Sequence, residues 1–180
     1  MYTQSFVRRA TVIILLFHLL CKGGSALAQT ISTWSTSPSS TNWFDPLNWS
    51  SGVPSATSDS ASVAGKANTV IIDLNAQATL GQLNLFGFGG IEIRGTGPLV
   101  FDNPGSAPAS IRTLSDPPGN LDARITSPVS IASGEQLLID LATRKNLDLR
   151  GGIKSLEGNI TKRGAGSLTL SSDNSTWTGS

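Results

Sequence analysis

Five carboxylates are the residues best suited to catalysis on sugars. Asp73, Glu92, Asp122, Asp140 and Asp148 all lie within or beside short apolar segments. Glycoside hydrolysis requires two carboxyl groups about 5–10 Å apart across the scissile bond. No pair among the five is distinguished by its spacing, and most occupy polar positions of alternating segments, where exposure to solvent is the simpler interpretation. The sequence therefore predicts no catalytic residue and a protein that is not an enzyme.

Three of the four tryptophans lie close together, at Trp34, Trp43 and Trp49, with Phe44 beside them. Flat aromatic rings stack on sugars, so this group is the best candidate for a binding site. The alternative is that the rings cover the open N-terminal end of the fold, because each buried tryptophan removes roughly 150–250 Å² from water. We favour the covering role. In a sugar-binding module, Trp43→Ala would remove affinity without unfolding, whereas in a cap it would cost stability.

Residues 1–28 have the three parts of a secretory signal peptide. Two arginines supply positive charge, and the apolar run 10–21 is too short to span a bilayer, which needs roughly 20 apolar residues. Ala26 and Ala28 form the small-x-small cleavage site. We expect cleavage after Ala28 and no transmembrane segment in the mature chain. The protein is thus predicted to be exported to the periplasm, the cell surface or the medium.

Removal of the signal peptide also removes residues on which many sites depend. The only histidine, cysteine and tyrosine are His18, Cys21 and Tyr2. Zinc sites of His and Cys, Ser-His-Asp triads, Cys nucleophiles and disulfides are therefore not expected in the mature chain. No cofactor-binding or metal-binding residue is predicted. The mature chain keeps ten basic against twelve acidic residues, a net charge of −2, which argues against nucleic acid as a partner.

Short alternating segments recur along the chain, for example 83–86, 91–94, 137–141 and 147–150. A strand directs alternate side chains to opposite faces, so each segment has one buried and one solvated face. Turn residues separate the segments about every 8–13 residues, which fits a sandwich, a barrel or a β-solenoid. Because Asn-Gly hairpin signals are missing, we favour the solenoid. The predicted fold is all-β, with each strand paired to its equivalent in the next coil.

Two stretches carry a resemblance to a known family. Residues 159–179 read NITKRGAGSLTLSSDNSTWTG and resemble the autotransporter-associated β-strand repeat, approximately itK.GaGtLtLsg.NtytG. Residues 42–54, NWFDPLNWSSGVP, are similar to the opening of many such exported repeat proteins. Trp177 stands where the family usually has tyrosine, a mild departure. The resemblance implies a right-handed parallel β-helix (a solenoid) in the passenger region of a bacterial surface protein.

The repeat also has a physical interpretation. Gly164 and Gly166 would permit a tight corner with φ > 0, Leu168 and Leu170 would point into the core, and Asn174 suits a turn. Relatives continue through further repeats, so the resemblance implies that this chain is the N-terminal fragment of a passenger. A solenoid that ended here would leave an unpaired strand edge, which favours edge-to-edge self-association.

The sequence is accordingly divided into a signal peptide at 1–28, a Ser/Thr/Trp-rich cap segment at 29–67 and β-helix coils at 68–180. The predicted function is a non-catalytic structural or adhesive role at the cell surface, with an extracellular polysaccharide or protein as partner. One alternative is a carbohydrate-active enzyme, a polysaccharide lyase or glycosidase, on the same scaffold. Another is a sugar-binding module that uses the N-terminal tryptophans. An enzyme should bring two acids and a base from successive coils together, whereas a scaffold should show polar ladders without such convergence.

Export is expected to yield a mature protein that begins at Gln29, which intact-mass measurement and N-terminal sequencing of the exported chain will check. Ala28→Arg is expected to block cleavage, because signal peptidase requires a small side chain there. Ala28→Ser is the matched control and should still be cleaved. A correctly sized mature chain from the Ala28→Arg variant would show that the site lies elsewhere.

Overall fold

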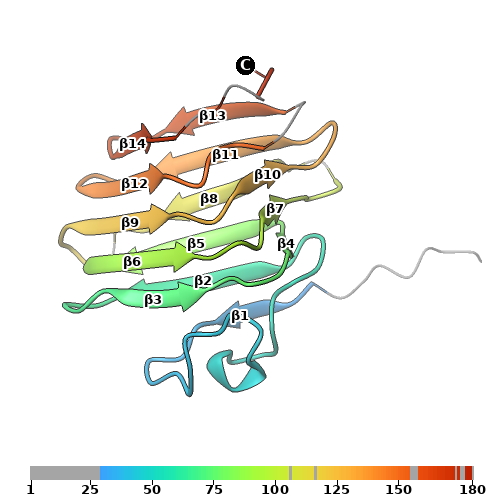
Figure 1. Cartoon of the computed structure of the whole chain (residues 1–180). Helices are drawn as coiled ribbons and strands as arrows, with labels where there is room; N and C mark the ends of the chain where they lie inside the picture. The colour runs from blue at the N-terminus through green and yellow to red at the C-terminus, as the bar shows by residue number, and fades with distance from the viewer. Residues whose placement is uncertain are drawn as a thin grey trace, which may run out of the picture.

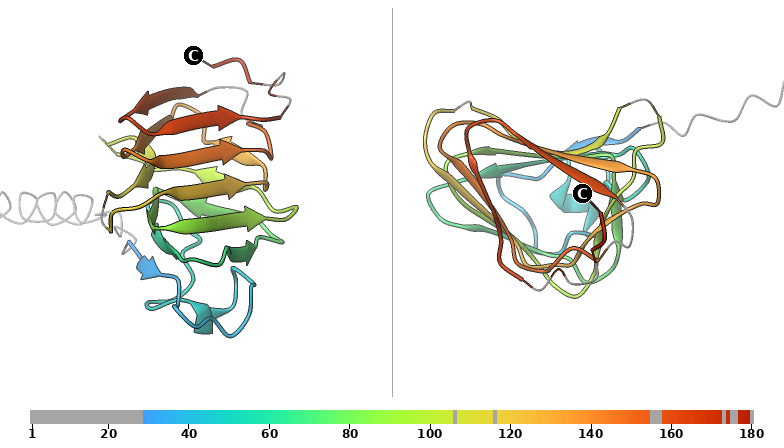
Figure 2. Two further views of the ribbon diagram at one scale, coloured as in Figure 1. Left: turned by 90° about the vertical axis from the view of Figure 1, so that its left-hand side faces the viewer. Right: turned by 90° about the horizontal axis from the view of Figure 1, so that it is seen from above.

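The protein is a stack of coils built from three parallel sheets, as seen in a computed structural model that describes residues 29–105, 107–115, 117–154, 158–172, 174 and 177–179 (Figure 1). The predicted signal peptide at 1–28 lies outside the described residues. Viewed along the stack, the coils overlie one another with a roughly triangular outline (Figure 2). The predicted all-β solenoid is therefore confirmed.

Each coil contributes a strand to two or three of the sheets, and neighbouring strands within these sheets run parallel. The six-stranded sheet has the order β1 (Ile31–Thr33), β2 (Ser60–Gly65), β5 (Gln82–Gly87), β8 (Ala109–Thr113), β11 (Gln136–Leu141) and β13 (Asn159–Arg163). The five-stranded sheet has the order β3 (Val70–Asp73), β6 (Gly89–Arg94), β9 (Leu121–Ile125), β12 (Lys145–Leu149) and β14 (Ser167–Leu170). The three-stranded sheet has the order β4 (Ala78–Leu80), β7 (Leu99–Phe101) and β10 (Val129–Ile131).

The core consists of apolar side chains stacked in register from coil to coil. One inward ladder of the five-stranded sheet is Ile72, Ile93, Ile125, Leu149 and Leu170. Its first four members are at most 1% exposed, whereas Leu170 is 40% exposed. The expected inward position of Leu170 is thus confirmed by the register. Its exposure follows because no further described strand packs beyond β14.

The corner glycines of the repeat have two different physical roles. Gly164 adopts φ +73°, as the sequence predicted. Gly166 does not have a positive φ, so that part of the prediction is wrong. A Cβ at Gly166 would instead lie 2.3 Å from the carbonyl oxygen of Lys145 and 2.5 Å from that of Ala142. Gly166 is therefore required by the close approach of the preceding coil.

Asn174 and Trp177 of the repeat both bond to the backbone. The Asn174 side chain accepts a hydrogen bond from the Ile153 N–H at 2.8 Å and donates to the Ser172 carbonyl at 2.9 Å. The Trp177 indole N–H donates to the Gly158 carbonyl at 2.9 Å. The turn role expected for Asn174 is thus realised through its side chain, which satisfies backbone groups of neighbouring segments.

The segment 29–67 is continuous with the coils. Its strands β1 and β2 belong to the six-stranded sheet, and β2 pairs with β5 from Ser60 to Gly65. The remainder, including a short 3₁₀ helix at Pro46–Asn48, lies at the N-terminal end of the stack (Figure 1). Within the described residues, no helix has the length and apolar character needed to cross a membrane.

Gly166→Ala is expected to lower the free energy of unfolding by about 1–3 kcal/mol, because the added methyl group must displace packed backbone. Gly105→Ala is the matched control, since a Cβ there has no atom within 4 Å and φ is not positive. Urea denaturation of a chain of residues 29–180 measures both. Equal midpoints for the two variants would contradict the proposed close approach.

Candidate functional site

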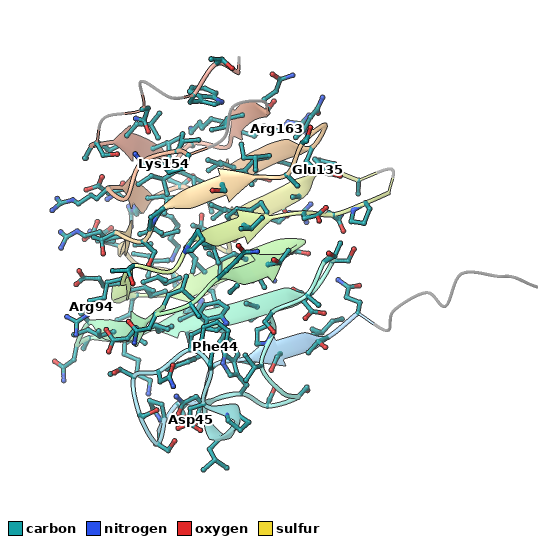
Figure 3. The ribbon with its side chains drawn as sticks, turned by 45° about the vertical axis from the view of Figure 1, so that its right-hand side comes forward. Phe44, Asp45, Arg94, Glu135, Lys154 and Arg163 are labelled. Atoms are coloured by element: carbon teal, nitrogen blue, oxygen red, sulfur yellow. The ribbon has the colours of Figure 1, made fainter. Side chains whose placement is uncertain are left out.

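The three N-terminal tryptophans are buried. Trp34, Trp43 and Trp49 are 3%, 0% and 6% exposed. The Trp49 ring packs edge-on against Trp34, with centroids 5.0 Å apart, and against Trp43, with centroids 4.8 Å apart. All three belong to the same apolar cluster as the coils, and Phe44 is half-buried against it (Figure 3). Their ring faces are therefore not presented to a sugar in this structure, which fits the covering role.

Polar side chains organise the loop that carries these rings. Asn48 is fully buried, and its side chain bonds to the backbone of Ser39, Ser40 and Asn42 at 2.8–3.3 Å. Asp45 accepts hydrogen bonds from the hydroxyls of Ser39 and Ser40 and from a backbone N–H of the 3₁₀ helix. These hydrogen bonds, that of Ser39 foremost, lower the pKa of Asp45. The loop is thus held by a satisfied polar network, as buried polar groups require.

Two further carboxylates hold the N-terminal segment, Asp59 from within it and Asp73 from the first coil. Asp59 is 4% exposed and accepts hydrogen bonds from three backbone N–H groups, those of Thr30, Ser55 and Ala56, at 2.7–3.1 Å. Asp73, the last residue of β3, bonds to Arg94 at 2.7 Å and to the Thr41 hydroxyl. The hydrogen bond from Arg94, followed by that from Thr41, lowers the pKa of Asp73. Asp73 therefore has an anchoring role.

The structure brings four of the five candidate acids to the outer face of the five-stranded sheet. Three of them, Asp73, Glu92 and Asp148, lie beside arginines, whereas Asp122 lies beside Asn146. Glu92, Arg124 and Asp148 occupy consecutive rungs of one ladder. Asp73 pairs with Arg94 at 2.7 Å, and Asp148 pairs with Arg150 at 2.6 Å. The fifth acid, Asp140, lies on the outer face of the six-stranded sheet. Glu92, Arg124 and Asp148 thus form a ladder of alternating charge.

Asp122 and Asp148 also bond to side chains of neighbouring coils. Asp122 accepts a hydrogen bond from Asn146 at 2.7 Å. Burial raises the pKa of Asp148, but hydrogen bonds from Ser171 and Arg150 more than offset that effect, so the pKa of Asp148 is lowered. A general acid needs the opposite shift, a raised pKa. These contacts indicate that Asp148 stabilises the stacking of coils.

Lys145 is a buried cation that the sequence analysis did not single out. It is 1% exposed, and its ammonium group donates to the carbonyl oxygens of Gly87, Gly119 and Pro117 at 2.8, 3.0 and 3.3 Å. An ammonium group has three protons to donate, so the three carbonyls replace the water that it loses on burial. Because these carbonyls belong to two earlier corners, Lys145 links three successive coils at one edge of the solenoid.

The outer face of the six-stranded sheet carries residues that the sequence analysis missed. Phe86 occupies an outward position beyond Asn84, and Phe88 is 47% exposed at the corner that follows. On the next rung Leu114 is 46% exposed, and its N–H donates to the Leu85 carbonyl at 3.0 Å, which places it beside Phe86. A signal was present in the sequence, because Phe86 falls where the alternation calls for a polar residue.

Among the described residues, no three His, Cys, Asp or Glu side chains gather in a way that could hold a metal ion. No protein-family model, curated protein or solved structure gives a significant match to this chain.

Asp73→Asn is expected to destabilise the protein at neutral pH and to matter less as the pH falls. The pKa of Asp73 in the folded chain lies below its usual value of 3.8, so its stabilisation is complete above that value and is lost as the pH falls through the folded pKa. Urea midpoints of wild type and variant, measured from pH 7 to pH 3, should therefore converge.

Glu92→Gln is the control for this experiment. Glu92 is an outward carboxylate on the same sheet with no hydrogen bond or ion pair within the described part of the chain. Its replacement should change the midpoint little at any pH. A difference between Asp73→Asn and wild type that stays constant across the range would contradict the anchoring role.

Proposed function

We propose that the protein is a non-catalytic exported scaffold of the passenger type, with a structural or adhesive role at the cell surface. The observation that carries the proposal is the continuous register of a parallel solenoid whose outward side chains form polar ladders. Such a scaffold presents a repetitive surface along its axis and needs no converging acid and base. The resemblance of residues 159–179 to the autotransporter-associated repeat supports the same function.

The polar ladders of the six-stranded sheet are bonded along and across strands. Gln82 donates to Asn84 within β5 at 2.7 Å. Asn84 in turn donates to the hydroxyls of Ser60 and Ser62 on β2, both at 3.3 Å. Cross-strand pairs of this kind stabilise a sheet by roughly 0.2–1 kcal/mol each. The hydrogen bonds from Asn84 to Ser60 and Ser62 join successive coils, and for that reason they support a scaffold.

The carbohydrate-active enzyme remains the second candidate, and one observation favours it. Glu92 and Asp148 lie two rungs apart with Arg124 between them. Strands are about 4.7–4.9 Å apart, so the two backbones are separated by about 9–10 Å, near the upper limit of the carboxyl separation in inverting glycosidases. The lowered pKa of Asp148 and its ion pair with Arg150 argue for the scaffold instead.

An antibody against residues 29–180 is expected to label intact cells of the organism that produces the protein. External proteinase K should remove the labelling while a cytoplasmic marker protein stays intact. Labelling that appears only after the cells are opened would contradict the surface role.

To test for catalysis, the purified mature chain is incubated with polygalacturonate and xylan. Neither new reducing ends nor unsaturated products are expected, and Asp148→Asn should behave as wild type. Depolymerisation that is lost in Asp148→Asn but kept in Asp140→Asn would favour the enzyme.

A further inference from the structure

The outer face of the six-stranded sheet combines outward aromatic, amide and cationic side chains on adjacent rungs, of which Asn84 and Phe86 are half-buried and Arg112 is exposed. Phe86 and Asn84 are outward residues of β5, and Phe88 is exposed at the corner that follows. Arg112 occupies the rung next to Asn84 on β8. Aromatic rings provide an apolar surface with defined geometry, and planar amide and guanidinium groups make directed hydrogen bonds. This set of side chains suits a ligand that has both apolar faces and many hydroxyl groups.

The cations on this face differ from those on the five-stranded sheet. Arg112 and Arg163 flank Asp140 in one ladder. None of the three has an ion pair or side-chain hydrogen bond within the described residues. On the five-stranded sheet, by contrast, Arg94 and Arg150 are both engaged by aspartates, and Arg124 lies between two carboxylates, Glu92 and Asp148. Arg112 and Arg163 share a single neighbouring carboxylate among the described residues, so their guanidinium groups keep donors for a ligand.

The charge of this face indicates the sign of that ligand. Its central ladder has two arginines and one aspartate, whereas the mature chain has a net charge of −2. Arg163 and Arg94 lie on opposite sides of the stack (Figure 3). A local excess of positive charge on an otherwise acidic protein attracts anions. Guanidinium groups bind carboxylates in a bidentate manner.

We propose that the outer face of the six-stranded sheet binds an acidic polysaccharide that carries carboxylate groups. This inference rests on the proposed adhesive function and names its binding face. The polymer lies along the direction of β5 and β8, because Phe88 follows Asn84 by four residues, which span at most about 13 Å of extended strand. A sugar carboxylate bonds to Arg112, and the apolar face of a sugar ring packs on Phe88. A sugar hydroxyl donates to the second lone pair of the Asn84 amide oxygen, because the Asn84 amide group already donates to Ser60 and Ser62. The buried tryptophans take no part.

The test uses the purified mature chain and oligogalacturonate, with neutral dextran as the comparison ligand, in isothermal titration calorimetry. Oligogalacturonate is expected to bind, more weakly as salt increases, and dextran is not. Arg112→Gln and Phe88→Ser should each weaken binding at least tenfold. Both side chains are exposed, so urea midpoints should stay near wild type.

Arg124→Gln is the matched control, because Arg124 is an exposed, outward arginine in the middle of the five-stranded sheet. Its affinity for oligogalacturonate should equal that of wild type. Weakening by Arg124→Gln but not by Arg112→Gln would overturn the assignment of the face and leave the adhesive function standing. Absence of oligogalacturonate binding would overturn the inference, while surface labelling of intact cells tests the proposed function separately.

One outcome would identify a different use of the same surface. If the chain forms concentration-dependent oligomers that Phe88→Ser abolishes, and no oligogalacturonate binds, then Phe86, Phe88 and Leu114 pack against a second copy. Analytical ultracentrifugation of wild type and Phe88→Ser measures this directly. That result would overturn the polysaccharide proposal.

Discussion

The stacking of each coil on the one before it, in fixed register, is the constraint on which the whole structure depends. Inward positions form apolar ladders such as Ile72, Ile93, Ile125 and Leu149, and each member covers the one below it. A shift of one residue would turn every such side chain outward, because side chains alternate with a period of two. The same register determines which charges and aromatic rings become neighbours on the outer faces.

The corners set that register because backbone packs directly on backbone there. Gly166 lies so close to the carbonyl oxygens of Ala142 and Lys145 that a side chain would not fit. At the corner between the six-stranded and five-stranded sheets, the Lys145 ammonium group occupies a site formed by carbonyls of two earlier coils. Short contacts and a buried cation thus hold the corners together, and the described residues contain no cysteine that could form a disulfide.

The N-terminal end is closed by a different set of interactions. Trp34, Trp43 and Trp49 extend the apolar core beyond the first coil. The segment that carries these tryptophans is held by Asp59, through backbone N–H groups, and by Asp73, through the Thr41 hydroxyl. Each tryptophan buries roughly 150–250 Å², so the hydrophobic gain is large, while the carboxylates determine where the segment docks. The tryptophans therefore supply the stability of this end, and the carboxylates fix where the segment lies.

The strands and their inward residues could be predicted from the sequence, because alternation with a period of two is a local property. The positive φ of Gly164 and the burial of the tryptophans were likewise predicted from their residue types. Which outward residues meet, however, depends on how the coils stack. Lys145 reaches the Gly87 carbonyl 58 residues away, and Glu92 lies beside Arg124 only because of the length of the coil between them. Contacts between coils depend on corner lengths and register, which no local pattern specifies.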